Sequence, residues 1–321
     1  MQDLGYELVE VPPANLRVHR KVRDVLEHRS GRPMDKTFRS ARKAAGADIV
    51  FAFLEREALA ASWAKRHRVP PYCSKPLVML SCWLAEELRT MTPEERRSVV
   101  RSYSGVDLIL VWSSNQVDLL IEAGFASDRV EAINFGFAPG FFPPADVRAR
   151  SGVLAIGADR GRDYGTLMSA VAGTGIQVDL YAGQGNVAGL TIPDEVTFHG
   201  RVPYEEYRRL VAAASVVTVP TVELAYPTGQ TVALEAAATG ACVILTDTPA
   251  IREYFSEDTA LMVPPLDVDG WQGALRLVTQ DQKFRENMGR RASDDVHARF
   301  TYLQMWQQVD RLLRVRGWTR Q

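Results

Sequence analysis

Residues 215–246 read SVVTVPTVELAYPTGQTVALEAAATGACVILT. This stretch decides the fold, because it contains an apolar strand, a loop rich in Pro, Thr and Gly, an alanine-rich helix and a second apolar strand. A strand, a helix and a strand in this order predict a parallel pair joined by a right-handed crossover. The helix is apolar on nearly every side, so we expect it to be buried between the sheet and another layer.

The predicted helix carries one carboxylate, Glu235, among alanines. A buried carboxylate is costly unless it is paired, so Glu235 needs a partner. The turn before the helix consists of Thr228, Gly229, Gln230 and Thr231. Backbone N–H groups at the start of a helix have no partner within the helix and lie at its positive end. The turn therefore predicts a seat for an anion such as a diphosphate.

The composition narrows the classes of function. The chain has 321 residues, 46% of them hydrophobic, which is enough for two α/β domains with cores of their own. The net charge of −1 predicts no electrostatic footprint for duplex nucleic acid, so we expect no nucleic-acid partner. Cys73, Cys82 and Cys242 lack CxxC spacing, which argues against a disulfide framework and a zinc site.

The sequence favours a cytoplasmic location. It contains no run of about eighteen uncharged apolar residues that would predict a membrane span. Its start carries Asp3, Glu7 and Glu10 and lacks the basic-then-apolar order of a signal peptide. Nothing in the sequence supports membrane association.

The first part of the chain alternates short apolar runs with charged, helical patterns. Such alternation predicts a parallel sheet with helical crossovers. The glycines and prolines of GFAPGFFPPADVRARSG break regular structure after Phe135 and predict a linker. We therefore expect a first Rossmann-like domain over residues 1–143. Its predicted strands begin at Tyr6, Ala47, Pro76 and Val106.

A second series of apolar runs predicts a second doubly wound domain over residues 150–300. Continuous apolar strands are typical of a sheet covered on both faces. The last part, 301–321, predicts a helix that could pack back on the first domain. Ligands bind beyond the carboxyl ends of strands in such sheets, so we expect the site in a cleft between the domains. The predicted strands begin at Gly152, Ile176, Val196, Ser215, Ala241 and Leu261.

Three long segments resemble the GT-B glycosyltransferases, specifically the retaining, nucleotide-sugar-dependent family four. The first, SNQVDLLIEAGFASDRVEAINFGFAPGFFPP at 114–144, is similar to the end of that family's acceptor domain and its hinge. The others, FHGRVPYEEYRRLVAAASVVTVP at 198–220 and TVALEAAATGACVILTDTPAIREYF at 231–255, are similar to its donor domain. The resemblance implies an α/β fold of two Rossmann-like domains with a cleft between them. The first domain looks reduced, since GYELVEV resembles the family's second strand.

One departure from the family concerns its EX7E motif. The first glutamate of that motif falls on Pro227 here, Glu223 is out of register, and only Glu235 remains. Some members carry a similar Gly-Gln-Thr turn. This likeness assigns the lost sugar contact to residues 228–231, through their backbone N–H groups and the amide of Gln230.

The resemblance assigns further roles around the donor. Glu235 would accept hydrogen bonds from ribose hydroxyls, with a salt bridge to an arginine as the structural alternative. Arg160 and Arg162 would lie against the leaving diphosphate. Their alternative is an exposed loop in which both arginines pair with Asp159 and Asp163.

The remaining candidates follow other predicted strands. Gly183 ends a strand and allows backbone to approach a nucleotide. His199, Gly200 and Arg201 end the next strand, where family members contact the base through main chain, although His199 fits packing equally well. Trp83 follows a strand of the first domain, where many members carry a histidine. It could stack on a sugar, and a core role is the alternative.

These features predict an enzyme that moves a sugar from a nucleoside-diphosphate sugar to an acceptor hydroxyl with retention of configuration. A UDP- or GDP-sugar is the expected donor, and the acceptor is a small molecule, a glycan or a lipid-linked sugar. The resemblance implies no cofactor and no bound metal. Two alternatives stay open, a non-catalytic nucleotide-sugar-binding protein or partner subunit, and a GT-B nucleotide-sugar epimerase.

Overall fold

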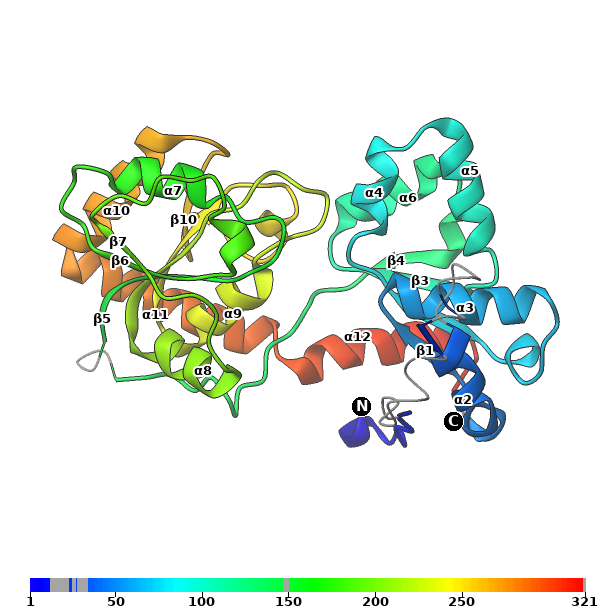
Figure 1. Ribbon diagram of the computed structural model, residues 1–321. Coiled ribbons are helices and arrows are strands. Elements are labelled where there is room, and N and C mark those ends of the chain that lie inside the picture. Colours follow the sequence, from blue (N-terminus) through cyan, green and yellow to red (C-terminus); the bar gives the residue numbers. More distant parts are fainter. Residues whose placement is uncertain (12–22, 25–26, 28–33, 147–149, 320–321) are drawn as a thin grey trace. The chain divides into compact units, whose positions relative to one another are not determined.

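The computed structural model describes residues 1–321 except 12–22, 25–26, 28–33, 147–149 and 320–321 (Figure 1). The chain divides into two compact units. Unit 1 contains residues 1–133 and 306–321, and unit 2 contains residues 134–305. Each unit contains one parallel sheet, with four strands in unit 1 and six in unit 2. The predicted α/β class with two parallel sheets is confirmed.

Unit 1 has the strand order β1-β2-β3-β4, and every pair is parallel. Strands that follow one another across a sheet place their right-handed crossovers on one face, which is where α3 to α6 belong. Its elements are η1 (Gln2–Leu4), α2 (Met34–Gly46), β1 (Val50–Phe53), α3 (Glu55–Arg66), η2 (Tyr72–Ser74), β2 (Leu77–Leu80), α4 (Leu84–Thr90), α5 (Pro93–Ser102), β3 (Leu108–Val111), α6 (Ser114–Ala123), η3 (Ser127–Arg129) and β4 (Val130–Ala132).

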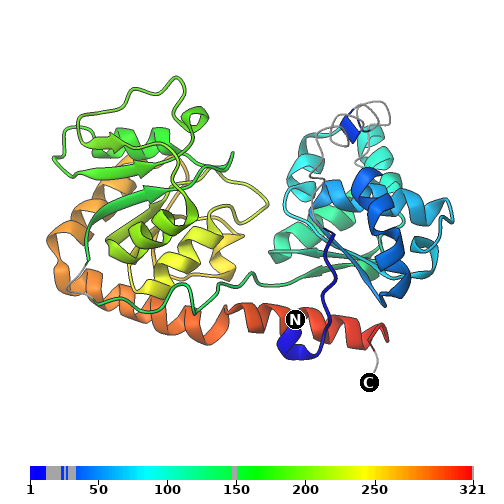
Figure 2. The ribbon, with the colours of Figure 1, turned by 60° about the horizontal axis from the view of Figure 1, so that its bottom comes forward.

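The opposite face of this sheet contacts the end of the chain. Phe51 and Phe53 alternate with Ala52 along β1, so both side chains point to the same face. Each packs edge-on against Trp306 of α12 (Tyr302–Val315), with ring centroids 6.3 Å apart. Figure 2 shows this part of α12 in red alongside the sheet. The terminal helix thus supplies one layer of unit 1 from residue 306 onward.

The prediction of a first strand in this unit is wrong. Residues 6–11, where the sequence predicts a strand from Tyr6, form none, although all of them are described. Their apolar members Leu8 and Val9 are about half exposed, at 51% and 52%, so the alternating pattern has no buried face to drive pairing. Strand β4 was not predicted. Three residues are too few to give a periodic signal, and the strand forms because Val130 pairs with Ile109.

Unit 2 contains all six strands that the sequence predicts from Gly152 onward. Their order in the sheet is β10-β9-β8-β5-β6-β7, and every pair is parallel. The elements are β5 (Ser151–Ile156), α7 (Tyr164–Val171), β6 (Val178–Tyr181), η5 (Gln184–Asn186), β7 (Val196–Phe198), α8 (Tyr204–Ala213), β8 (Ala214–Val219), α9 (Gln230–Thr239), β9 (Cys242–Thr246), η6 (Ile251–Glu253), β10 (Leu261–Val263), α10 (Val268–Gln280), α11 (Gln282–Arg299) and the start of α12.

The strand order places a ligand site at one point of this sheet. Counted within the unit from β5, the order is 3-2-1-4-5-6, which is the Rossmann arrangement. The order reverses between β5 and β8, which pair at Val153 and Val216. In open parallel sheets the crevice at such a switch point receives the ligand. The loops that follow β5 and β8 are therefore the first place to look for function.

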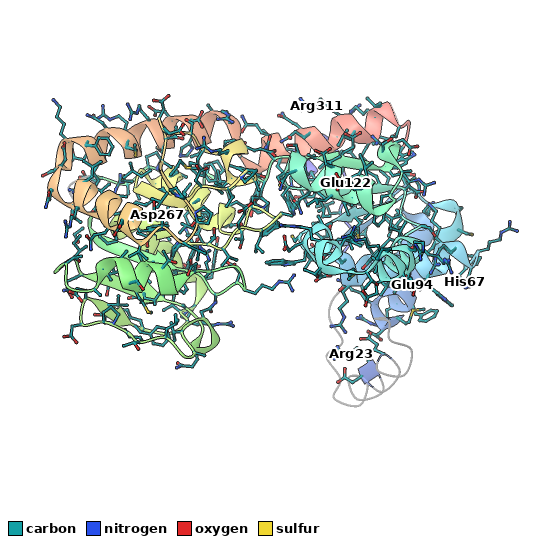
Figure 3. All side chains as sticks on the ribbon, turned by 90° about the horizontal axis from the view of Figure 1, so that it is seen from above. Arg23, His67, Glu94, Glu122, Asp267 and Arg311 are labelled. Atoms are coloured by element: carbon teal, nitrogen blue, oxygen red, sulfur yellow. The ribbon has the colours of Figure 1, made fainter. Side chains whose placement is uncertain are left out.

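Helices cover both faces of the six-stranded sheet. Figure 1 shows α8, α9 and α11 on one side of the sheet and α7 and α10 on the other. Every residue of α9 except Thr231 is buried, which confirms the prediction of a fully covered helix. Asp267, labelled in Figure 3, caps the start of α10, where its carboxylate accepts a hydrogen bond from the N–H of Gly270 at 2.9 Å.

The glycine- and proline-rich linker belongs to unit 2 by its contacts. Phe137 donates its N–H to the carbonyl of Phe300 at 2.8 Å, and the side chains of Phe137 and Phe142 are buried in the core of the unit. A β-carbon on Gly136 would lie 2.5 Å from the carbonyl oxygen of Thr301, so only glycine fits this approach. The division between the units therefore falls after Ile133, rather than at residue 143.

None of the helices in the described residues is long and apolar enough to cross a membrane.

Candidate functional site

Two loops meet at the switch point of unit 2. The loop after β5 spans residues 157–163 and the loop after β8 spans residues 220–229. Asp163 donates its N–H to the carbonyl of Pro220 at 3.0 Å, and Val222 donates its N–H to the carbonyl of Gly161 at 2.9 Å. These backbone bonds hold both loops at the carboxyl ends of adjacent strands, where a ligand of such a sheet binds.

Arg162 is the buried cation of this junction. Its side chain is only 2% exposed, and its Nε donates to Asp159 Oδ2 at 2.7 Å. Its Nη1 is buried and has no hydrogen-bond partner among the described residues. Burial alone would lower the pKa of Arg162, but Tyr164 and Asp159 outweigh burial and raise it, so the guanidinium stays charged. A buried, charged donor without a partner can receive an anion.

Glycines make room for this guanidinium. A β-carbon on Gly157 would lie 2.4 Å from Arg162 Nη2, and one on Gly229 would lie 3.1 Å from Nη1. Both residues have φ values, +145° and +82°, that favour glycine. The unpartnered Nη1 therefore lies next to the backbone at the start of α9.

Asp159 holds the two loops together. Its carboxylate accepts hydrogen bonds from the N–H of Gly161 at 3.0 Å, from the hydroxyl of Thr228 at 2.7 Å and from Arg162. Burial raises the pKa of Asp159, but the charge of Arg162 and these hydrogen bonds outweigh burial, and the net pKa is lowered. Asp159 is therefore an anionic counter-ion that fixes Arg162 in place.

The turn before α9 corrects one sequence expectation. The N–H of Thr228 donates to the carbonyl of Tyr226 at 2.7 Å, and that of Gln230 donates to Pro227 at 3.1 Å. These two groups are therefore used inside the turn. Within the described residues, the N–H groups of Gly229 and Thr231 make no such bond. The anion site predicted over residues 228–231 is therefore reduced to these two N–H donors, because the turn uses the other two in its own hydrogen bonds before the helix begins.

Gln230 contributes a buried amide at the same point. The residue is 1% exposed, and its Nε2 donates to the hydroxyl of Tyr226 at 3.4 Å. Its Oε1 is buried, and no residue that the structure describes forms a hydrogen bond with it. Buried polar atoms are nearly always hydrogen-bonded in native proteins, so an orphaned Oε1 indicates a place that a ligand or water completes.

Glu235 has a partner, and that partner is a tyrosine. The hydroxyl of Tyr207 in α8 donates to Glu235 Oε2. The carboxylate is 5% exposed and forms no ion pair with an arginine of the described residues, so the salt-bridge alternative is not what the structure shows. Burial raises the pKa of Glu235 to about 7, and the hydrogen bond from Tyr207 opposes that increase.

Electrostatics connect this carboxylate to the buried arginine. Burial and the adjacent Glu235 raise the pKa of Tyr207 well above its usual value, and the positive charge of Arg162 opposes that increase. Arg162, Tyr207 and Glu235 therefore share one neighbourhood at the start of α8 and α9.

The loop after β6 brings together two further predicted residues. A β-carbon on Gly183 would lie 3.0 Å from Arg201 Nε, so the guanidinium of Arg201 passes directly over this glycine. The N–H of Gly183 donates to Asn186 Oδ1 at 3.1 Å. Asn186 in turn donates its Nδ2 to the carbonyl of Asp159 at 2.9 Å. The loops after β5 and β6 are therefore one connected structure.

His199 is engaged by neighbours in the sheet. Its Nε2 lies 2.7 Å from Asp179 Oδ1, and its ring stacks on Tyr181 with centroids 4.4 Å apart and planes 10° apart. These contacts fit the packing role that the sequence left open. Gly200 next to it has φ +77°, a conformation suited to glycine.

Three predicted residues have side chains that are not fully buried. Arg160 is exposed on the loop after β5, and Thr231 is half-buried at the start of α9. Trp83 belongs to unit 1, at the end of β2, where its N–H donates to Glu55 Oε1 at 2.7 Å. The backbone N–H of Trp83 is therefore used by a carboxylate of the protein itself.

Sequence reasoning missed Tyr207. The segment PYEEYRRLV places Tyr204, Tyr207 and Val211 on one face of a helix, a pattern that indicates core packing. The sequence did contain a signal for this pair. A buried tyrosine hydroxyl requires a hydrogen-bond partner, and Glu235 was already predicted to need one. The sequence did not predict that α8 and α9 would lie close enough for these two side chains to meet.

Among the described residues, no group of three His, Cys, Asp or Glu side chains gathers in a way that could hold a metal ion.

Comparison with protein families finds one match, in unit 2. The family profile "Glycosyl transferases group 1" matches residues 162–281, from the buried arginine to the end of α10. No curated protein matches the sequence significantly.

Several solved structures share the fold at low sequence identity. HepE from Anabaena in complex with UDP and glucose has a TM-score of 0.70 and 16% identity, covering 86% of this chain and 80% of that chain. Sucrose-phosphate synthase from Thermosynechococcus elongatus has a TM-score of 0.67 and 21% identity, covering 88% and 79%. A trehalose 6-phosphate synthase from Burkholderia multivorans has a TM-score of 0.63 and 13% identity, covering 86% and 76%. The chain therefore has the GT-B fold, and residues 162–281 match the group 1 glycosyltransferase profile.

Proposed function

We propose that the protein is a retaining glycosyltransferase that moves a sugar from a nucleoside-diphosphate sugar to an acceptor hydroxyl. The group 1 glycosyltransferase domain supports the transfer of a sugar. HepE has been crystallised with UDP-glucose, which supports a UDP-sugar as the first donor to test and a GDP-sugar as the second. The acceptor is a small molecule, a glycan or a lipid-linked sugar.

One observation carries the proposal. The unpartnered Nη1 of Arg162 lies beside Gly229, at the positive end of α9, in the switch-point crevice of a Rossmann sheet. A cation about 4 Å from a developing negative charge gains about 4 kcal/mol at an effective dielectric constant near 20. A leaving diphosphate develops such charge, so this arrangement stabilises the transition state of donor cleavage.

The other buried groups fit the rest of a donor. Glu235 presents a carboxylate that accepts one hydrogen bond from the residues that the structure describes, which leaves capacity for the two hydroxyls of a ribose. The orphaned Oε1 of Gln230 is an acceptor for a hydroxyl of the transferred sugar. Among the residues that the structure describes, nothing lies within 4 Å of a β-carbon placed on Gly200, so the backbone there allows close approach of the nucleotide base. Arg201, which covers Gly183, borders the same loop.

The reaction would proceed on one face of the sugar. The diphosphate leaves through an oxocarbenium-like state, and an oxygen of that leaving phosphate assists deprotonation of the acceptor hydroxyl, which attacks from the same side. No carboxylate nucleophile takes part. Arg162 and the N–H groups of Gly229 and Thr231 neutralise the leaving group, so we propose that the reaction needs no metal ion.

Donor cleavage tests this function. We would incubate the protein with UDP-, GDP- and dTDP-glucose, with and without EDTA, and measure release of the nucleoside diphosphate. We expect release from one donor, unchanged by EDTA and lost in Arg162→Gln. The matched control is Arg209→Gln, since Arg209 is an exposed arginine of the same unit that pairs with Glu206. The proposal fails if no donor is bound or cleaved.

A non-catalytic nucleotide-sugar-binding protein is the second candidate, and one observation favours it. Pro227 is buried where the family has its first glutamate, and Glu223 is exposed, so the loop presents no carboxylate to the sugar. This protein would bind a donor without releasing nucleoside diphosphate, whatever acceptor is offered. Calorimetric binding combined with the cleavage assay separates the two, and chromatography of the recovered donor would reveal an epimerase by a changed sugar.

A further inference from the structure

The partner of Glu235 comes from a different helix at the same end of the sheet. Tyr207 is in the first turn of α8 (Tyr204–Ala213), and Glu235 is in the second turn of α9 (Gln230–Thr239). Both helices follow strands whose carboxyl ends form the ligand edge of the sheet. The hydroxyl of Tyr207 donates to Glu235 Oε2 across the two helices.

The ring of Tyr207 is held from two sides. It stacks on Tyr204 with ring centroids 5.8 Å apart and planes 15° apart. It packs edge-on against Phe142, whose centroid is 6.3 Å away and whose side chain is buried in the core of unit 2. A phenol fixed in this way directs its hydroxyl to one place, so it also fixes the carboxylate that accepts its hydrogen bond.

The carboxylate of Glu235 keeps unused acceptor capacity. Two carboxylate oxygens can accept about four hydrogen bonds. Within the described residues, Oε2 accepts one from Tyr207 and Oε1 accepts none. The two hydroxyls of a ribose could therefore reach the carboxylate without displacing Tyr207.

We propose that Tyr207 is a positioning residue that orients the Glu235 carboxylate to receive the 2′- and 3′-hydroxyls of the donor's ribose. The inference rests on the proposed function, since it assigns Tyr207 a part in the same donor site. Tyr207 acts through Glu235 and need not touch the nucleotide.

The charge state of Glu235 supports this role. Burial raises the pKa of Glu235 to about 7, and the hydrogen bond from Tyr207 counteracts burial. Without that bond more of Glu235 is protonated at neutral pH, and a protonated carboxyl has less capacity to accept. The titratable and charged groups that also face this pair are Tyr204 of α8, Tyr302 of α12 and Arg162 of the loop after β5.

The test compares two nucleotides that differ only in the ribose diol. Calorimetry measures the dissociation constants of UDP and 2′,3′-dideoxy-UDP, or of the GDP pair if GDP is the nucleotide that binds, for the wild type and Tyr207→Phe. We expect Tyr207→Phe to weaken the natural nucleotide about ten- to hundredfold, the range for a hydrogen bond to a charged group. The dideoxy nucleotide should lose less than about twofold, because it has no diol for Glu235 to hold.

Two further variants complete the design. Tyr204→Phe is the matched control, since it keeps the ring that stacks on Tyr207 and removes a hydroxyl with no bond to Glu235. It should leave both dissociation constants within about twofold. In Glu235→Gln, adding Tyr207→Phe should weaken the natural nucleotide much less than it does in the wild type, since the two residues act as a unit.

Each outcome of these measurements supports or overturns the positioning role of Tyr207. Equal weakening of both nucleotides by Tyr207→Phe would mean that Tyr207 only packs the site, and no weakening would mean that it does not act on Glu235. Either result overturns this inference while leaving the proposed function standing. A wild type that binds neither UDP nor GDP overturns the proposed function, and this inference with it. If Tyr207→Phe does not fold, Tyr207→Leu gives the same comparison.

Discussion

Two buried or partly buried glutamates, one in each unit, differ in how far the protein satisfies them. In unit 1, Glu55 Oε1 accepts four hydrogen bonds, from the hydroxyl of Ser81 and from three backbone N–H groups at the start of α4. In the described residues of unit 2, Glu235 accepts one hydrogen bond, from Tyr207. A carboxylate saturated by its own backbone stabilises the fold, whereas one held by a single side chain keeps the capacity to bind a ligand.

The same contrast applies to the strand ends near these two glutamates. The backbone N–H groups after β2 donate hydrogen bonds to Glu55, which is a carboxylate of the protein itself. At the switch point of unit 2, the buried Arg162 Nη1 and Gln230 Oε1 have no hydrogen-bond partner within the described part of the chain. The end of β2 is therefore satisfied by the protein itself, while the switch point of unit 2 keeps buried polar atoms that are able to bind a ligand.

The largest expected effect comes from removing the buried cation. Arg162→Gln should reduce kcat/KM for donor cleavage about 10²- to 10³-fold, or roughly 3 to 4 kcal/mol, the usual effect of losing one preorganised group that stabilises developing charge. The exposed Arg209→Gln should change it less than twofold, in the range of about 0.5 kcal/mol for surface substitutions. A loss below tenfold in Arg162→Gln would contradict the role of Arg162 at the diphosphate.

The next effect is on unit 1. Glu55→Ala removes the acceptor of the N–H groups of Cys82, Trp83 and Leu84, and should reduce the free energy of unfolding by about 3 kcal/mol. Denaturant unfolding followed by tryptophan fluorescence measures it. The control is Glu122→Ala, at an exposed position of α6 labelled in Figure 3, with an expected change within about 0.5 kcal/mol. Equal effects of the two variants would remove the contrast between Glu55 and Glu235.

A smaller effect appears as a pH dependence of Glu235. Burial raises the pKa of Glu235 from 4.5 to about 7, so the folded protein binds a proton there that the unfolded chain has released. The contribution of Glu235 to the free energy of unfolding is therefore lost as the pH rises from 4.5 to about 7. The full loss is at most about 3 kcal/mol.

Glu235→Gln cannot titrate, so its stability relative to the wild type should increase over the same pH window. Unfolding curves of both proteins between pH 4.5 and 8 give the difference at each pH, and effects of all other groups cancel. A difference that stays constant with pH would show that burial does not hold a proton on Glu235, and would make this carboxylate resemble a solvated one.

The smallest effect separates close packing from backbone conformation at the start of α9. Gly229 and Gly189 have nearly equal φ values, +82° and +79°, so alanine costs similar backbone strain at both. A β-carbon on Gly229 would lie 2.4 Å from Val219, whereas nothing lies within 4 Å of one on Gly189. Gly229→Ala should therefore lower the free energy of unfolding about 2 kcal/mol more than Gly189→Ala, as expected for overpacking. Similar stability of the two variants would show that the switch-point turn is loosely packed.

Much of the fold could be predicted because its signals are local. The six strands of unit 2 were found from continuous apolar runs, and the burial of α9 from its alanines. Local signals also misled, since the alternation at Tyr6–Val11 suggested a strand that has no buried face. Strand β4 escaped because three residues give no periodicity, and it exists only through its pairing with β3.

The candidate site was predicted in part. Arg162, Thr228 and Gly229 gather at one point, as their places after β5 and β8 suggested. Which N–H groups of the turn stay available could not be predicted, since Thr228 and Gln230 use theirs within the turn. The roles assigned to Arg160, His199 and Trp83 stay predictions.

The sequence by itself determined that unit 2 is a covered parallel sheet and that Glu235 lies buried and needs a partner, because hydrophobic pattern and the cost of a buried charge are properties of the local chain. Only the tertiary structure decided that the partner is Tyr207 and that Arg162 keeps an unsatisfied donor. Hydrogen bonds between helices depend on how those helices pack on the sheet, and that packing is settled by the whole core of the unit.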